Sequence, residues 1–291
     1  MGRAADIIQD AKRVALEHTD ALDAALAAWP VDAGPAEAAA SEAALVAALA
    51  LTTTADYNWR GSHPFCEQPS AAAAVSSFWA PLCRAMRPLQ RREDIFLAGY
   101  NDVEGKEHEL WVCSMGHFAG LFDRPWLGIP PTGRLSYLRY VEFHRVDTAR
   151  GLIAESCVHC DVIAFMIQAG HNPLPPAMGA HITPHPGPAT HAGRLLHPQL
   201  PASGVATLAL CNQMSADLSE LNEKASQAPV AGADEVPVEL LARTWHDDMV
   251  WYGPGGIGAT YVIHTGLTDS LQSFKNLLTA FRWLRFACRE S

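Results

Sequence analysis

The chain has 291 residues, of which 49% are hydrophobic and 18% are charged, and its formal net charge is −10. This composition indicates a folded globular protein with a sizeable core and excludes a disordered chain. The acidic balance, with no basic run or Arg-rich helix, argues against binding to nucleic acid or to an anionic membrane.

The start of the sequence carries no signal for secretion or membrane insertion. The segment MGRAADIIQDAKRV lacks the apolar region of a signal peptide. No stretch approaches the roughly 20 apolar residues of a membrane span. The seven cysteines are odd in number and irregularly spaced, which is typical of reduced, mostly buried thiols. We therefore expect a cytoplasmic protein.

Three helices are expected first along the chain, over residues 5–28, 36–51 and 70–86. Their apolar side chains recur at helical spacing, and the second helix is rich in alanine. Pro30 ends the first helix, and Pro81 predicts a kink or restart in the third.

The next part of the chain reads as strands, over residues 94–102, 108–122, 135–146 and 151–160. These segments are rich in aromatic and β-branched residues and are separated by Gly, Asp and Pro turns. Helices followed by a run of antiparallel strands predict an α+β fold, in which a curved sheet carries helices on one face.

The last third of the chain predicts a linker and a second unit. Residues 173–204 are rich in Pro and His and predict a linker, and a helix is expected over 205–224. DYNWRG at 56–61 and DMVWYG at 248–253 share the pattern Asp-x-x-Trp-x-Gly, a weak internal repeat. We therefore predict a first domain over 1–172 and an incomplete second module over 205–291.

Three stretches together resemble a known family: WVCSMGHFAGLFDRPWLGIPPTGR, YVEFHRV and GLIAESCVHCDVIAFMIQAG. They are similar to the SnoaL-like polyketide (ester) cyclases of the nuclear transport factor two-like superfamily, over roughly residues 55–172. WHDDMVWYGPGGIGATY looks like the opening of a second such module, although the chain departs from the family pattern after Tyr261. The resemblance implies a cone-shaped curved antiparallel sheet around a pocket that helices close, with an aspartate and a histidine inside the cone and no metal.

Asp161 and His117 match the family's catalytic aspartate and histidine, and both also have plain structural interpretations. Asp161 lies where a strand over 152–160 gives way to helical spacing, so it is either an N-cap or a carboxylate on the wall of an apolar pocket. In that strand, alternate side chains put Glu155, Cys157, His159 and Asp161 on one face. His117 lies in a largely apolar row and is either a core histidine or a catalytic one.

Aromatic and polar side chains near these two residues predict the walls of a pocket for a hydrophobic ligand. Core packing is the alternative for the aromatic ones. The predicted substrate-binding residues are Trp59, Arg60, Trp79, Phe118, Trp126, Tyr140, Glu142 and His144.

Other motifs lack a required partner, so we expect neither a metal nor a cofactor. The CxxC at 157–160 has no second cysteine pair at zinc-finger spacing and lies within a strand. The GxGxxG at 253–258 is not followed by the strand, helix and acidic residue of a dinucleotide site. Four histidines that could suggest a metal site lie among prolines and are expected to be solvated linker residues: His181, His185, His191 and His197. No GxSxG nucleophile elbow occurs, so a hydrolase mechanism of that type has no support.

These observations favour a cofactor-independent acid/base enzyme acting on a hydrophobic small molecule that carries a carbonyl group. Asp161 would remove a proton next to the carbonyl, and His117 would donate to the developing enolate oxygen. The reaction would be an intramolecular aldol-type cyclisation or a related isomerisation or dehydration. The alternative is a cone that binds a small molecule or a protein without catalysis.

The C-terminal segment predicts an amphipathic helix whose apolar stripe runs from Leu271 to Leu284 at steps of three and four residues. Monomeric proteins rarely leave such a stripe in water. We therefore expect it to be covered, and we expect a homodimer because sheets of this superfamily commonly pair.

Overall fold

The computed structural model divides into two compact units. The first unit contains residues 1–171 and 186–198, and the second contains residues 172–185 and 199–291. The residues that the structure describes are 2–173, 187–188, 190, 192–227, 243–245, 250–252 and 260–262.

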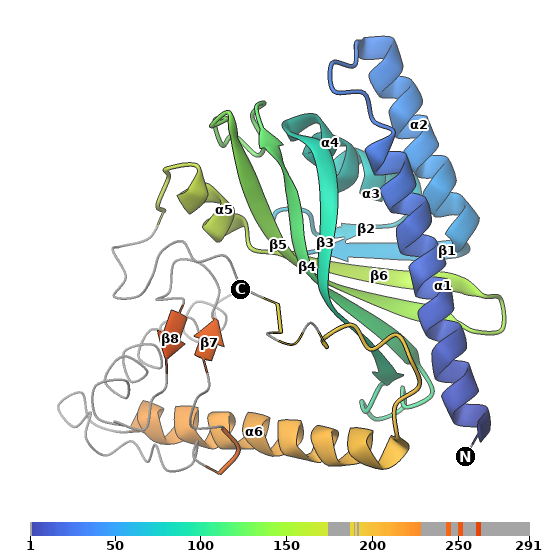
Figure 1. Ribbon diagram of the computed structural model, residues 1–291, viewed down its shortest axis with the longest axis vertical. Helices are drawn as coiled ribbons and strands as arrows, with labels where there is room; N and C mark the ends of the chain where they lie inside the picture. The colour runs from blue at the N-terminus through green and yellow to red at the C-terminus, as the bar shows by residue number, and fades with distance from the viewer. Residues whose placement is uncertain are drawn as a thin grey trace. The chain divides into compact units, whose positions relative to one another are not determined.

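A six-stranded sheet with the strand order β2-β1-β6-β5-β4-β3 forms the first unit (Figure 1). Its strands are β1 (Thr53–Gly61), β2 (Glu67–Gln68), β3 (Met86–Tyr100), β4 (Leu110–Phe122), β5 (Arg134–Asp147) and β6 (Leu152–Cys160). Neighbouring strands are antiparallel except β1 and β6, which are parallel. The predicted α+β class is confirmed, but the expected all-antiparallel sheet is wrong at β1. This strand and β6 lie far apart in sequence and are not joined by a hairpin, so no turn forces them to run in opposite directions.

The long strands β3, β4 and β5 bend along their length (Figure 1). The register of β3 against β4 shifts twice, between Arg87 and Gln90 and between Glu93 and Ile95. Gly116 on β4 lies opposite the second shift, and a Cβ atom there would be 1.9 Å from the carbonyl oxygen of Arg92. Glycine at this position therefore allows the close approach that bends the sheet.

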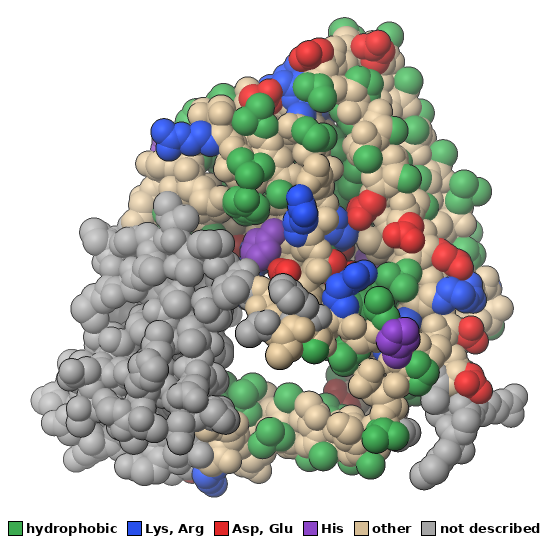
Figure 2. Space-filling model, in the orientation of Figure 1, with side chains coloured by type: hydrophobic (Ala, Val, Ile, Leu, Met, Phe, Trp, Pro, Cys, Tyr) green, Lys and Arg blue, Asp and Glu red, His purple; other side chains and the backbone are tan. Residues whose placement is uncertain are grey.

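Helices cover one face of this sheet, which we call the inner face; the opposite one is the outer face. α1 (Gly2–Ala27) contacts β3, β4, β5 and β6, and α2 (Pro35–Thr52) packs beside it. On β5 the residues of the inner face are buried and those of the outer face are partly exposed, in strict alternation from Ser136 to Asp147. Acidic side chains lie along α1 and α2 with few basic ones among them on the face in view (Figure 2).

The predicted helix over 70–86 is one helical segment with an irregular turn in it. α3 (Ala71–Ala74) continues into a π-helical turn at Val75–Trp79 and then into α4 (Ala80–Ala85). The π-helical turn ends just before Pro81, the residue whose missing N–H predicted an irregularity. At the other end of the unit, β6 leads into the short helix α5 (Val162–Gln168).

By length and composition alone, α2 is apolar enough to cross a membrane, which the search for a 20-residue apolar stretch did not predict. This is weak evidence, because a core helix of a globular protein passes the same test. Leu45 and Leu49 of α2 are buried in the core of the first unit.

Part of the predicted linker belongs to the first unit. Residues 193–195, which we call the edge segment, run parallel to β3 at the free edge of the sheet. The Phe96 N–H donates to the carbonyl of Gly193 at 3.0 Å, and the Leu195 N–H donates to the carbonyl of Phe96 at 2.8 Å. The edge segment is thus hydrogen-bonded structure within a Pro-rich stretch.

The second unit contains α6 (Pro201–Gln227), which includes the predicted helix over 205–224, and an antiparallel pair of short strands. The strands are β7 (Val250–Tyr252) and β8 (Thr260–Val262), and β7 lies within the second copy of the Asp-x-x-Trp-x-Gly pattern. The predicted helix over 271–285, the glycine pattern at 253–258, and His181, His185 and His191 lie outside the described residues.

Candidate functional site

A buried arginine forms the centre of the polar cluster on the inner face. Arg91 of β3 forms an ion pair with Glu142 of β5, and the two side chains are only 4% and 1% exposed. The Nε atom of Arg91 also donates to both carboxylate oxygens of Asp23 on α1, at 2.9 and 3.1 Å. The guanidinium lies over the rings of Phe118 and Tyr140, with its carbon 4.9 and 5.0 Å from their centroids.

These contacts keep the arginine charged in a dry environment. Burial opposes the charge, but Glu142 and Asp23 raise the pKa of Arg91 well above its ordinary value. Burial raises the pKa of the Glu142 carboxyl, and the attraction of Arg91 opposes that shift. Each partner therefore offsets part of the desolvation cost of the other, and removing either one would leave an unpaired buried charge.

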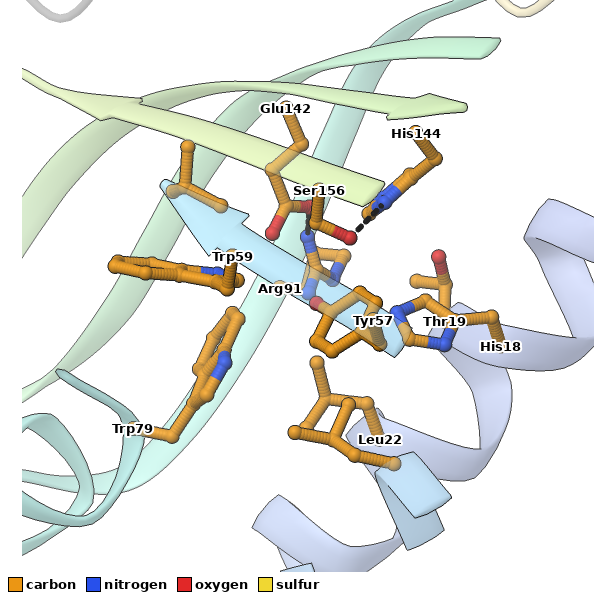
Figure 3. A pocket seen from close by; sticks show the side chains of 12 residues that line it. His18, Thr19, Leu22, Tyr57, Trp59, Trp79, Arg91, Glu142, His144 and Ser156 are labelled. Carbon is orange, nitrogen blue, oxygen red and sulfur yellow. Dashed lines mark hydrogen bonds and ion pairs between the residues drawn. The ribbon is translucent and has the colours of Figure 1, made fainter. Parts of the chain in front are cut away.

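Two histidines lie next to this ion pair. His18 of α1 and His144 of β5 are 2% and 3% exposed, and their ring centroids are 5.1 Å apart (Figure 3). His18 Nδ1 lies 2.7 Å from Thr52 Oγ1, and His144 Nδ1 lies 2.8 Å from Ser156 Oγ.

Both imidazoles are neutral near pH 7. Burial, aided by the positive charge of Arg91, lowers the pKa of His144 to about 3. Burial, together with His144 and Arg91, lowers the pKa of His18 well below its ordinary value. A neutral imidazole carries one N–H donor and one lone pair, so each ring can either give or accept a hydrogen bond.

The cluster lines a narrow pocket between α1, β1 and the inner face of the sheet (Figure 3). The pocket is too narrow to hold a water molecule. Its lining residues are His18, Thr19, Leu22, Leu49, Tyr57, Trp59, Trp79, Arg91, Glu142, His144, Ser156 and Val158.

Two polar atoms of this lining have no hydrogen-bond partner among the residues that the structure describes. They are Trp59 Nε1 and His144 Nε2, and both are buried. Buried polar atoms are ordinarily paired with protein or water, so unpaired ones at a pocket point to a missing polar partner. The Trp59 atom is an N–H donor, which fits an acceptor oxygen of a ligand.

The predicted substrate-binding residues divide into three groups. Trp59, Trp79, Glu142 and His144 line the pocket. Phe118 and Tyr140 are not among the lining residues; their rings stack on each other with centroids 4.5 Å apart, and both contact Arg91. The Tyr140 hydroxyl is 3.2 Å from Ser114 Oγ.

Arg60 and Trp126 lie elsewhere. Arg60 is exposed and forms an ion pair with Glu155. Trp126 is buried against Phe65 and Phe165, away from the pocket lining. Neither residue lines this pocket, and a substrate-binding role for them stays a prediction. Arg60 alternates with the inward Trp59 along β1, and Trp126 fills the core beside α5.

The predicted catalytic pair lies away from the pocket lining. Asp161 caps α5: its Oδ1 atom accepts a hydrogen bond from the Ala164 N–H at 2.8 Å, which is the N-cap interpretation. His117 lies on the outer face of β4, paired in register with Arg139 of β5, and its Nδ1 atom is 3.4 Å from Asp94 Oδ2. Asp161 is next to Arg139 through a hydrogen bond from its N–H to the Arg139 carbonyl. A catalytic role for this pair stays a prediction.

The lining residues that were not predicted include His18, Tyr57, Arg91 and Ser156. His18 lies on a helix far from the strands in sequence, so only the tertiary fold brings it to the pocket. Ser156 alternates with Glu155 and Cys157 on β6, and the prediction followed the row that faces outward. Tyr57 shares the phase of the predicted Trp59 on β1, which was the one available signal.

The CxxC does not form a metal or disulfide site. Cys157 is partly exposed on the outer face of β6, 3.3 Å from His159 Nε2, whereas Cys160 belongs to the inward row. All six described cysteines are free thiols. Within the described part of the chain, no group of three or more His, Cys, Asp or Glu side chains is placed to hold a metal ion.

Comparison with solved structures shows likeness over about half of the chain. A protein from Jannaschia sp. CCS1, provisionally assigned as a SnoaL-like polyketide cyclase, is 18% identical over 57% of this chain and 96% of its own, with a TM-score of 0.37. An NTF2-like protein from Burkholderia thailandensis E264 is 17% identical over 55% of this chain and 96% of its own, with a TM-score of 0.35. A phenazine biosynthesis-related protein from Pseudomonas aeruginosa is 11% identical over 63% of this chain and 99% of its own, with a TM-score of 0.36.

No protein-family model matches the chain, and no curated protein does. The chain is thus similar to solved SnoaL-like and NTF2-like structures.

Proposed function

We propose that the protein is a cofactor-independent acid/base enzyme acting on a small hydrophobic metabolite that carries a carbonyl group. The observation that supports this most directly is the pair of buried neutral imidazoles, His18 and His144, beside a buried arginine in an aromatic-walled pocket. A neutral imidazole can accept a proton at physiological pH, and a neighbouring N–H or cation can stabilise the oxygen that becomes negative.

Hydrogen-bond accounting assigns the role of base to His18. The Thr52 hydroxyl donates to the carbonyls of Ala48 and Leu49, each at 3.2 Å, so its hydrogen is already in use. In that arrangement its oxygen accepts from His18, with the His18 proton on Nδ1. The other nitrogen, Nε2, therefore has a free lone pair that can remove a proton from a bound molecule.

The opposite side of the pocket offers positive charge and hydrogen-bond donors. Arg91 carries its charge beside the pocket, and Trp59 Nε1 is a buried N–H donor with no partner among the described residues. These groups suit a carbonyl oxygen that becomes an enolate when a neighbouring proton leaves. Trp59, Trp79 and Leu22 give the apolar walls that a hydrophobic metabolite requires.

The reaction class we propose is proton removal next to a carbonyl, leading to intramolecular aldol-type cyclisation or to isomerisation or dehydration. The pocket as described has no room for a ligand, so binding requires its walls to move apart. Their closing over a ligand would hold it folded and exclude water. We place this chemistry in the cytoplasm, where the free thiols would stay reduced.

A second candidate is a domain that binds a small molecule without turning it over. The observation that favours it is the charge balance of the cluster, because Glu142 and Asp23 already neutralise Arg91. A fully paired arginine stabilises a negative oxygen less than a free one does, and binding alone needs no base.

Exchange of α-protons for deuterium tests the two candidates. We would incubate the protein in D₂O with 2-tetralone, a bicyclic ketone with acidic α-protons, and follow the loss of the α-proton signals by NMR. The wild-type protein should exchange them faster than buffer, and His18→Gln should lose about a hundredfold of that acceleration or more, as expected for a general base.

Matched variants test whether the exchange activity depends on the pocket or on the sequence-predicted Asp161. Asp161→Asn keeps an N-cap side chain and should keep the activity, and His159→Gln replaces an exposed histidine of β6 as a control. If Asp161→Asn lost activity while His18→Gln kept it, Asp161 would carry the chemistry, as the sequence predicted. Binding of 2-tetralone with no exchange in any variant would favour the second candidate.

A further inference from the structure

We propose that Asp23 occupies the position of a ligand carboxylate, and that the pocket takes a hydrophobic carbonyl compound that also carries a carboxylate group. On binding, the ligand's carboxylate replaces Asp23 as a partner of Arg91, while Glu142 stays in place. The substrate class rests on the proposed function, but the replacement of one carboxylate by another can be measured as binding alone.

The two carboxylates that pair with Arg91 differ in their access to water. Glu142 belongs to the sheet and its side chain is 1% exposed, whereas the Asp23 side chain on α1 is 33% exposed. Burial raises the pKa of the Asp23 carboxyl, and the attraction of Arg91 offsets only part of this shift. An Asp23 that leaves Arg91 can turn to water, while a Glu142 without Arg91 would be an unpaired buried charge. Asp23 is therefore the partner that a ligand can replace.

The hydrogen bonds of Asp23 use part of what the guanidinium offers. Both hydrogen bonds to the Asp23 oxygens come from Arg91 Nε, at 2.9 and 3.1 Å. Arg87 shows the complete pairing, since its Nε donates to Asp123 Oδ1 at 3.1 Å and its Nη2 donates to Asp123 Oδ2 at 2.5 Å. Pairs in which two nitrogens bind two oxygens are the stronger and more specific ones. A free ligand carboxylate can take this geometry on Arg91, whereas Asp23 is held by its helix.

The contact between Asp23 and Arg91 lies at the border of the pocket. Thr19 and Leu22 of α1 line the pocket, and Asp23 follows Thr19 by four residues. Residues at this spacing lie on the same side of a helix, so Asp23 continues the pocket-facing side of α1. Arg91 itself lines the pocket. A ligand that enters beside Thr19 can thus meet the guanidinium of Arg91 where Asp23 now binds it.

The charge of the cluster requires that an acid replace Asp23 instead of binding beside it. One guanidinium pairs with two carboxylates, and His18 and His144 are neutral, so the cluster carries a net negative charge. A further carboxylate would be repelled strongly at short distance in a dry site. With Arg91 bound to the ligand's carboxylate, Trp59 Nε1 remains for the ketone oxygen. The pocket then selects a ligand with two oxygen-bearing groups, one anionic and one neutral.

Calorimetric titration with 2-naphthoate and with its neutral amide, 2-naphthamide, tests the inference near neutral pH. The two probes share one bicyclic skeleton and differ in charge. Asp23→Asn removes the competing charge and keeps a side chain of the same shape, so the affinity for 2-naphthoate should rise at least about tenfold. The affinity for 2-naphthamide should change little. Asp20→Asn removes an exposed charge on the same helix and should leave both affinities at their wild-type values.

Two further variants locate the bound acid and cover a failure to fold. Asp23→Ser is smaller and neutral, and it should give the same gain in 2-naphthoate affinity if Asp23→Asn does not fold. Asp23→Asn combined with Arg91→Lys keeps a positive charge beside Glu142 but lacks the fork of nitrogens, so most of the gain should be lost. In Asp23→Asn, 2-naphthoate should also shift the Nε–H signal of Arg91 in nitrogen NMR spectra, a signal that Arg91→Lys assigns.

An affinity for 2-naphthoate that is unchanged or lower in Asp23→Asn would overturn the inference. So would an equal rise for 2-naphthamide, since an Asp23 with a merely structural role would affect both probes alike. Absence of binding in every folded variant would overturn it too. The proposed function is judged separately, by proton exchange in 2-tetralone. If no exchange occurs there, that function fails, and the titrations still decide whether a ligand carboxylate replaces Asp23.

Discussion

At the scale of single residues, the first unit buries ionisable side chains whose charge states differ from those they have in water. His18 and His144 stay neutral because burial and the Arg91 charge both disfavour a second positive charge. Glu142 is also buried and Asp23 is half-buried, and burial raises the pKa of both carboxyls against the attraction of Arg91. The folded state therefore takes up and releases protons at pH values different from those of the unfolded chain, which makes stability depend on pH.

The stability of the protein should fall as the pH drops from 6.5 toward 4.5. The pKa of His144 is about 3 in the folded state against 6.5 for an ordinary histidine, so only the unfolded chain binds this proton in the window between them. The contribution of His144 to the unfolding free energy is thus fully present above pH 6.5. It is lost on acidification by about 1.4 kcal/mol per pH unit. Glu142 and Asp23, whose pKa values are raised, act in the opposite direction, so the variant comparison isolates the histidine.

Denaturant unfolding of wild-type protein and His144→Gln across this pH range measures the effect. The unfolding free energy of the variant should fall less steeply with decreasing pH than that of the wild-type protein. The difference in slope should be that caused by the binding of about one proton. Parallel curves for the two proteins would mean that His144 is already protonated in the folded state or is not buried as described. His159→Gln, an exposed change, should leave the slope near the wild-type value.

Sequence alone could place side chains in rows but not decide which row faces the pocket. Alternation along β6 correctly grouped Glu155, Cys157 and His159 on one face, and the structure places that face outward. The inward row of this strand is the more apolar one, but the match of Asp161 to the family's aspartate led the prediction to the other row. Glu142 and His144 were predicted as polar pocket residues, whereas His18 required the docking of α1.

At the scale of elements, the edge segment covers part of the edge that the long strand β3 would otherwise leave unpaired. β3 is the last strand of the sheet, and an unpaired edge invites pairing with other chains. Residues 193–195 cover part of this edge with backbone hydrogen bonds, and Arg194 Nε donates to Glu93 Oε1 at 2.6 Å. Lys12 of α1 donates to the carbonyl of Leu195, so the same segment also binds the helix that closes the pocket.

The edge segment depends on having glycine at position 193. A Cβ atom there would lie 2.4 Å from the Asp94 carbonyl oxygen, so Gly193→Ala should push the segment away from β3. Hydrogen exchange at the Phe96 amide, which donates to Gly193, should then become at least about tenfold faster, as for an amide released by local opening. Gly99→Ala is the matched control on β3, where a Cβ atom meets nothing within 4 Å, and unchanged exchange in Gly193→Ala would contradict the contact.

The elements themselves were largely predictable because their periodicity is local. The expected helices over 5–28 and 36–51 and the four strands from residue 94 onward agree with the observed ones within a few residues, apart from β3, which begins at Met86. Neither β1 nor the edge segment was predicted as a strand. Their hydrogen bonds come from partners far along the chain, and such pairing leaves no periodic pattern in a short segment.

At the scale of the whole molecule, the first unit has the sheet, covering helices and continuous core of a domain that folds independently. Its six strands, its covering helices and one continuous hydrophobic core come from residues 1–171 and 186–198. On its outer face, Leu121, Leu135 and Tyr137 remain 41%, 59% and 41% exposed. We propose that the protein is a homodimer, because an exposed apolar surface of this kind is commonly an association site.

A chain truncated after Pro198 should fold by itself. We expect a single cooperative thermal transition within a few degrees of the first transition of the full chain, since the core of the first unit is retained. Light scattering should give twice the chain mass for both proteins if the dimer forms through the first unit. An aggregated or unfolded truncated chain would show that the second unit is needed for stability, and a monomeric truncated chain beside a dimeric full chain would assign the dimer contact to residues 199–291.

The parallel pairing of β1 with β6 has a consequence for how the protein acquires its site during folding. Trp59 meets Ser156 only when the first strand of the sheet docks on the last, which closes a long loop of chain and is entropically slow. The meander of β3, β4, β5 and β6 has no such requirement, because each strand pairs with its sequence neighbour. During synthesis, a nascent chain could thus form most of its sheet before Tyr57 and Trp59 reach Ser156, and the pocket would be the last part of the first unit to mature.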